Sequence, residues 1–178
     1  MESPAIRPPN ATHPAALSEA HLMRDCQSRR QRRSGPGGQH RNKVETAVVL
    51  THLPSGVQGA ATERRSQEQN RVMALFRLRV NLALAVRIDC NLSGAQPSEL
   101  WQRRCRSGRI AINESHLDFP QMLAEALDVV AASDFDVKAA AGWLACSTTQ
   151  LVKLLHQESR AIQAVNQRRR EAGLHPLR

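Results

Sequence analysis

The apolar positions of the first half of the chain form two strand-like runs followed by a helical period. Residues 44–51 are rich in β-branched side chains, and residues 57–62 form a weaker second run. Between the runs, Leu53-Pro54-Ser55-Gly56 places proline and glycine at positions that turns favour. The pattern predicts a β-hairpin.

A long helix is predicted directly after the hairpin. Ser66-Gln67-Glu68-Gln69 matches a capping box, so the helix opens there and runs to about Arg87. Arg79 falls inside its apolar face, and the sequence offers no reason for this. The apolar positions recur at helical spacing and are Val72, Leu75, Phe76, Val80, Ala83 and Val86.

The last third of the chain has a helical pattern throughout. Four short helices are predicted over residues 119–132, 137–144, 148–156 and 160–172. Residues 138–151 resemble a helix-turn-helix, with Ser147 as the N-cap of its second helix. Large apolar side chains here are expected in the core rather than on a contact surface: Trp143, Leu144, Leu151, Leu154 and Leu155.

Prolines and glycines divide the chain into parts. Residues 1–19, with four prolines, are expected to be a disordered arm, and residues 34–38 can only be a loop. Residues 20–88 then form a small domain with the hairpin and long helix, and residues 89–114 form a basic linker. Residues 115–178 form a helical domain. The predicted fold class is α+β, with an all-α, helix-turn-helix-like bundle at the C-terminal end.

Charge is concentrated in one short stretch of this 178-residue chain. The net charge is +9, and residues 24–43 alone carry +6, whereas residues 114–159 carry −5. Clustered Lys and Arg around a glycine-rich loop indicate a phosphate-binding surface and a polyanionic partner. Aromatic residues make up only 3% and tyrosine is absent, which argues against a base-stacking platform for single strands.

The cysteines, histidines and apolar runs argue against metal-dependent, disulfide-bonded and membrane-spanning proteins. The four cysteines form no C-x-x-C pair and are expected to be reduced thiols, and the histidines lack metal-ligand spacing, so we expect neither a metal nor a cofactor. No apolar run is long enough to span a bilayer, and the N-terminus does not resemble a signal or transit peptide. The expected location is the cytoplasm, with no membrane partner.

The most specific feature is a glycine-rich loop with a second motif downstream. Residues 34–43 read Ser-Gly-Pro-Gly-Gly-Gln-His-Arg-Asn-Lys, and residues 63–71 read Glu-Arg-Arg-Ser-Gln-Glu-Gln-Asn-Arg at the start of the long helix. A Gly-Gly-Gln triplet alone is weak, but this ordered combination is specific. Over residues 20–88 it resembles the catalytic domain of class I peptide chain release factors, and most of all the short forms without stop-codon-reading domains.

The resemblance implies a ribosome-dependent hydrolase of the peptidyl-tRNA ester. Gly37, Gly38 and Gln39 would be catalytic, with the Gln39 backbone N–H stabilising the oxyanion and its side chain placing water. In such families this glutamine is often N-methylated, so a glutamine methyltransferase is an implied partner. Contacts to rRNA or tRNA phosphates are expected from basic residues flanking the loop, with Arg64 and Arg65 supporting it. The flanking residues are Arg30, Arg32, Arg33, Arg41 and Lys43, with His40 as either an RNA contact or a polar loop residue.

The chain also departs from the stop-codon factors of this family. Only 36 residues precede Gly37, so a codon-reading domain does not fit upstream and the expected activity is codon-independent, as in ribosome rescue. The helical domain is expected to dock on the catalytic domain or on a ribosomal protein, and the protein is expected to be a monomer off the ribosome. One alternative is a nucleic-acid-binding regulator that uses the helix-turn-helix-like segment and has a non-catalytic loop. Another is a ribosome-associated factor that binds the same site without catalysing.

Overall fold

A three-stranded antiparallel sheet organises the N-terminal half of the chain. The computed structural model describes residues 5–7, 12–31 and 46–178. Strands β2 (Cys26–Gln31), β3 (Ala47–His52) and β4 (Gln58–Ala61) lie in the order β2-β3-β4. β3 and β4 are the predicted hairpin, which is confirmed, and β2 is an edge strand that the sequence pattern did not predict.

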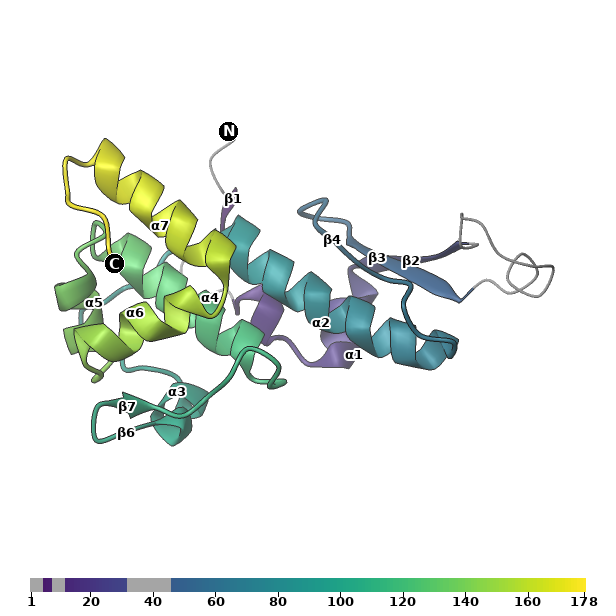
Figure 1. Cartoon of the computed structure of the whole chain (residues 1–178), viewed down its shortest axis with the longest axis horizontal. Coiled ribbons are helices and arrows are strands. Elements are labelled where there is room, and N and C mark those ends of the chain that lie inside the picture. Colours follow the sequence, from purple (N-terminus) through teal and green to yellow (C-terminus); the bar gives the residue numbers. More distant parts are fainter. Residues whose placement is uncertain (1–4, 8–11, 32–45) are drawn as a thin grey trace.

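Helix α2 (Gln67–Ala85) lies along the sheet and continues past it to the C-terminal helices (Figure 1). The predicted N-cap is confirmed, because the Ser66 hydroxyl accepts the Gln69 N–H. β4 approaches the helix very closely at Gly59, where a Cβ would lie 2.3 Å from the Ala74 carbonyl oxygen. Only glycine fits there, so this position sets the distance between the sheet and the helix.

The N-terminal segment packs against the middle and end of α2. It contains a short 3-10 helix (Pro14–Ala16) and α1 (Glu19–Arg24). His13 is buried; its Nδ1 accepts the Ala15 N–H, so its Nε2–H donates to the Val86 carbonyl oxygen at 3.2 Å. Arg79 donates to the Ala15 carbonyl oxygen at 2.7 Å, which explains this arginine on the apolar face of α2. Residues 12–19 are therefore packed, although the prolines predict a disordered arm there.

The segment predicted as a basic linker contains regular structure. Residues 89–114 include α3 (Glu99–Arg104) and a hairpin of β6 (Cys105–Arg106) and β7 (Arg109–Ile110). Trp101 of α3 is buried, and its indole N–H donates to the Leu144 carbonyl oxygen at 2.8 Å. The segment thus packs on the C-terminal helices, while the division of the chain into domains stays a prediction.

The C-terminal helices form the predicted bundle. They are α4 (Phe119–Ala132), α5 (Val137–Trp143), α6 (Thr148–His156) and α7 (Ser159–Glu171), within one residue of the predicted ranges. The Ser147 hydroxyl accepts the Gln150 N–H at 3.2 Å, which confirms it as the N-cap of α6. The leucines predicted in the core are buried, whereas Trp143 is half-buried with its N–H on the Leu92 carbonyl oxygen.

One hydrophobic core joins the sheet, α2 and the bundle. α4 packs against α2, and Arg87 in β5 (Val86–Ile88) donates to the buried Asp128 carboxylate of α4 at 2.9 Å. β5 also pairs in parallel with β1 (Ala5–Arg7). The predicted α+β class, with a helical bundle after the small sheet, is confirmed.

The described residues also show the state of the cysteines, of possible metal ligands and of apolar helices. All four cysteines are free thiols. Within residues 5–7, 12–31 and 46–178 no three His, Cys, Asp or Glu side chains gather into a group suited to a metal ion. No helix in the same parts of the chain has the length and apolar character needed to cross a bilayer.

Candidate functional site

Two paired strands flank the segment that contains the Gly-Gly-Gln triplet. Gln31, the last residue of β2, pairs with Ala47, the first residue of β3, and Arg30 pairs with Val48. Paired residues of antiparallel strands lie opposite one another. The chain therefore leaves β2 and enters β3 at the same end of the sheet.

Most of the predicted site lies outside the residues that the structure describes. This applies to the proposed catalytic residues Gly37, Gly38 and Gln39. It also applies to five predicted RNA contacts: Arg32, Arg33, His40, Arg41 and Lys43. The described part of the site consists of the strands and the start of α2 that flank this segment, here called the framework, together with Arg30, Arg64 and Arg65.

A buried asparagine forms the centre of that framework. Asn70, in the first turns of α2, has 0% exposure. Its amide nitrogen donates to the carbonyl oxygens of Thr46 at 2.6 Å and Arg64 at 2.9 Å, and its amide oxygen accepts the Arg64 N–H at 2.9 Å. Thr46 directly precedes β3. One side chain thus fixes the backbone entering β3 relative to the backbone entering α2.

The basic side chains around this end of the sheet fall into two groups. Arg71 pairs with Glu19 and Glu68, and Arg77 pairs with Glu63 and donates to the Ala60 carbonyl oxygen. These arginines hold α2 to its neighbours. By contrast, four exposed arginines form no ion pair with any residue in the described ranges: Arg29, Arg30, Arg64 and Arg65.

The unpaired group is suited to bind phosphate. Its guanidinium groups are exposed and not neutralised by a carboxylate of the described residues, so they can bind an external anion. Arg64 has two functions at once, since its backbone is held by Asn70 while its side chain stays exposed. The structure thus brings the predicted pair Arg64 and Arg65 to the start of α2.

The carboxylate of Glu63 is held in its charged form at the same corner. It accepts the Thr62 N–H at 2.9 Å and the Arg77 guanidinium at 2.6 Å. These hydrogen bonds, the backbone one first, lower the pKa of Glu63 to about 2. Glu63 therefore stays ionised at neutral pH and ties the end of β4 to α2 through Arg77.

At the opposite end of the sheet, a buried histidine closes the turn between β3 and β4. His52 has 0% exposure, and its Nδ1 lies 2.7 Å from the Ser55 hydroxyl. Its carbonyl oxygen accepts the Gly56 N–H at 2.8 Å, and Gly56 adopts a φ of +69°, which glycine tolerates best. This fixes the far end of the strand whose near end Asn70 holds.

Three residues that shape the site were not predicted from the sequence. Asn70 stood in the downstream motif without a role, and Gly59 and Arg77 were not singled out. An asparagine in the first turns of a helix is a weak sequence signal for a structural role. Its role depends on a carbonyl group 24 residues earlier, which only the fold brings next to it. Gly59 offers a slightly better signal, as an isolated glycine in a strand pattern indicates close backbone approach.

The sheet and α2 lie in the part of the chain that is similar to known proteins. The RF-1 domain family model matches residues 21–115, which contain the sheet, α2 and the β6–β7 hairpin. A peptide chain release factor 1 of Chlorobaculum tepidum is 57% identical over 73 residues, 41% of this chain and 19% of the relative. That of Symbiobacterium thermophilum is 49% identical over 78 residues, 44% of this chain and 20% of the relative.

A plant protein shows the same pattern. The chloroplastic peptide chain release factor PrfB1 of Arabidopsis thaliana is 55% identical over 51 residues, 29% of this chain and 11% of the relative. The chain therefore spans only a fifth or less of the length of these curated relatives. The RF-1 match nevertheless covers more than half of the 178 residues, and the chain belongs to the class I peptide chain release factor family.

Proposed function

We propose that this protein hydrolyses the ester of peptidyl-tRNA on the ribosome without reading a codon. The observation that supports this best is the framework around the Gly-Gly-Gln segment. The last residue of β2 pairs with the first residue of β3 on either side of it, and buried Asn70 fixes the backbone at Thr46. Such a framework anchors the residues on both sides of the segment, Gln31 and Thr46, to rigid elements, and preorganised catalysis requires a rigid support of this kind.

The reaction needs little from side chains. Water attacks the ester carbonyl carbon, a tetrahedral intermediate carries the negative charge on its oxygen, and the tRNA 3′ oxygen leaves with a proton. A backbone N–H aimed at that oxygen is the simplest stabilising group, and Gln39 would supply it. Gly37 and Gly38 would let the backbone approach the tRNA end without a Cβ, while the Gln39 side chain places water.

Binding to the ribosome would rest on the unpaired arginines. Arg30, Arg64 and Arg65 present exposed guanidinium groups, and the flanking Arg32, Arg33, His40, Arg41 and Lys43 add further contacts to rRNA and tRNA phosphates. The contacts fix orientation and carry no codon information. Gln39 would be the substrate of a glutamine methyltransferase.

Codon independence is supported by the segment after the RF-1 match. Residues beyond 115 form a helical bundle whose core is continuous with that of α2, and residues 114–159 carry a net charge of −5. Outside the face of α6, whose exposed positions carry no carboxylate, this bundle repels phosphates through its net negative charge, so it is a poor reader of an mRNA codon. We therefore place the activity on stalled ribosomes rather than on programmed stop codons.

A peptide-release assay tests the proposal. Ribosomes carrying labelled peptidyl-tRNA would be prepared with a stop codon, a sense codon or no codon in the vacant aminoacyl site, and release measured for the full chain. Similar rates on all three complexes are expected. A requirement for the stop codon would refute codon independence. Release from none of the complexes would refute the hydrolase and favour the regulator with a non-catalytic loop.

A further inference from the structure

The β6–β7 hairpin carries an electrostatic arrangement that costs stability. Arg106 and Arg109 are direct cross-strand partners, so their side chains leave the same face of the two-stranded ribbon. Both are exposed, and neither has an ion-pair partner within the described parts of the chain. Like charges directly opposite one another are destabilising. An external anion between them would remove that repulsion.

The hairpin is positioned by helix α6. The Gly108 carbonyl oxygen accepts the Ser147 N–H at 3.1 Å, and the Gln150 side chain accepts the Ile110 N–H at 3.2 Å. The tight turn at Ser107 and Gly108 has positive φ at both residues, as a two-residue hairpin turn of type I′ requires. The hairpin and α6 therefore form one fixed surface rather than a freely moving loop.

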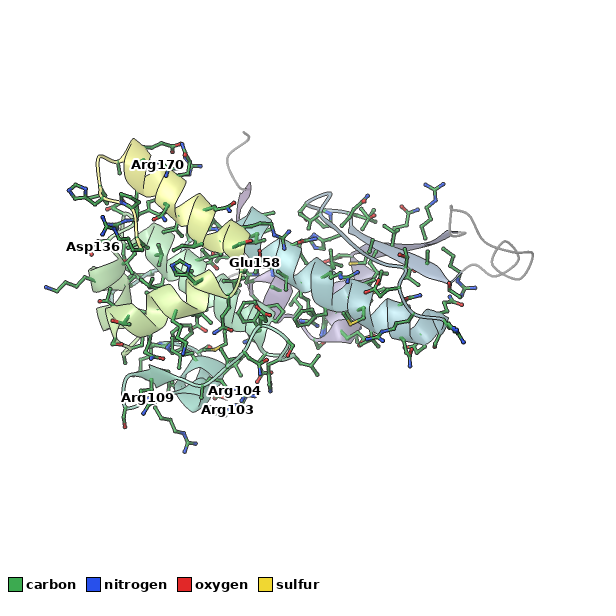
Figure 2. The ribbon with its side chains drawn as sticks, viewed as in Figure 1. Arg103, Arg104, Arg109, Asp136, Glu158 and Arg170 are labelled. Carbon is green, nitrogen blue, oxygen red and sulfur yellow. The ribbon has the colours of Figure 1, made fainter. Side chains whose placement is uncertain are left out.

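This hairpin–α6 surface carries a net positive charge. Residues 100–113 include four arginines and no carboxylate, and Arg104 alone among them is neutralised within the described ranges, by Asp118 at 2.7 Å. Arg103 and Arg109 lie at the same end of the molecule (Figure 2). The exposed positions of α6 also lack carboxylates, and the surface comprises Arg103, Arg106, Arg109, Thr148, Thr149 and Lys153.

We propose that the hairpin–α6 surface binds the phosphate backbone of double-helical RNA. Its arginines stay unneutralised by the described residues, although they lie beside a bundle that is acidic over residues 114–159. Phosphate contacts require only guanidinium and hydroxyl donors, which this surface has. On the ribosome, this surface would make a second RNA contact, separate from the one at the Gly-Gly-Gln end. That ribosomal role rests on the proposed function.

RNA backbone is favoured over sequence-specific DNA by the side chains of α6. Reading base edges in a major groove needs free Arg, Asn or Gln side chains on the second helix of a helix-turn-helix. Gln150 is the single such residue in α6, and its amide oxygen is already bound to the Ile110 N–H. The other exposed side chains of α6 suit backbone binding without base selection.

A binding assay with the full chain tests this inference without ribosomes or peptidyl-tRNA. Fluorescence anisotropy would use a roughly 20-base-pair RNA duplex and a DNA duplex of the same sequence, titrated at about 50 to 200 mM salt. Arg106→Glu with Arg109→Glu should weaken RNA binding about tenfold at low salt and reduce the salt slope by about 2. The matched control, Arg168→Glu with Arg170→Glu on α7, makes the same charge change and should leave both quantities unchanged.

A single substitution separates binding from folding. Arg106→Glu places a carboxylate opposite Arg109, so the hairpin gains an attractive pair and Tm should not fall, while RNA affinity drops several-fold. Equal effects of the hairpin and α7 variants would overturn the proposal, as would tighter binding of the DNA duplex. Because the assay contains no peptidyl-tRNA, a failure of the release activity would not change its outcome.

Discussion

Asn70→Asp tests whether a single buried amide supports the site. The substitution preserves shape and the acceptor for the Arg64 N–H, but it removes the two donated bonds, at 2.6 Å to the Thr46 carbonyl oxygen and 2.9 Å to that of Arg64. Leaving a buried acceptor without its donor costs about 1–3 kcal/mol. Two such losses predict a decrease of about 2–6 kcal/mol in the free energy of unfolding at neutral pH.

The pH dependence of this variant has a definite sign. A buried carboxylate facing two carbonyl oxygens favours its protonated form, so the folded-state pKa of the introduced carboxyl lies above its unfolded value. Protonation restores one donor. The stability deficit relative to the unsubstituted chain should therefore shrink as the pH falls through that raised pKa, and urea denaturation at about pH 7.5 and 5 measures it.

The control is Asn81→Ala, on the same helix at the other end of the sheet. Asn81 is half-buried; it donates to the Gln58 carbonyl oxygen at 2.7 Å and accepts the Arg160 guanidinium at 2.8 Å. Both bonds are exposed to water, so their loss should cost about 0.5–1.5 kcal/mol in all. Only Asn70→Asp should also slow peptide release at a temperature where it is folded. The assigned role of Asn70 would be refuted if Asn70→Asp lost no more free energy of unfolding than Asn81→Ala, or if Asn70→Asp released peptide at the normal rate.

Three further substitutions test other parts of the structure. Gly59→Ala puts a Cβ at 2.3 Å from the Ala74 carbonyl oxygen and the Leu78 nitrogen, so it should lower the free energy of unfolding by about 3 kcal/mol or more in urea denaturation; a near-neutral result would contradict the close approach of β4 to α2. Gly142→Ala, in α5 with open space around it, should stabilise the protein by about 0.5–1 kcal/mol, and a lower Tm by calorimetry would count against the position of that helix. Glu63→Gln removes a carboxyl whose pKa is about 2, so its stabilisation is present at pH above about 4.5 and disappears as the pH falls toward 2. Denaturation curves of the Glu63→Gln and unsubstituted chains should then converge at low pH, and an equal difference at neutral pH and near pH 2 would be inconsistent with that carboxylate.

Sequence patterns predicted the elements whose signals are local. The turn at Pro54 and Gly56 and the caps at Ser66 and Ser147 depend on residues within a few positions of each other, and all are confirmed. The edge strand β2 was missed because its sequence, Cys-Gln-Ser-Arg-Arg-Gln, is polar and lacks alternation. It becomes a strand through pairing with β3, a tertiary effect.

The family was predictable from the sequence, whereas the contacts that support the site were not. The Gly-Gly-Gln triplet with its downstream motif pointed to the family, which the RF-1 match confirms. The role of Asn70 depends on a carbonyl 24 residues away, and that of Arg79 on one 64 residues away. Such contacts require the folded arrangement, which no local pattern encodes.

The most direct test of the proposed hydrolase compares two glycine substitutions in one release assay. Gly38→Ala and the matched Gly142→Ala would be added to ribosomes holding peptidyl-tRNA with an empty aminoacyl site, and ribosome binding measured in parallel. We predict that Gly38→Ala slows release at least about 100-fold with binding retained, while Gly142→Ala releases peptide at the normal rate. Equal release by Gly38→Ala and the unsubstituted chain would contradict the proposal.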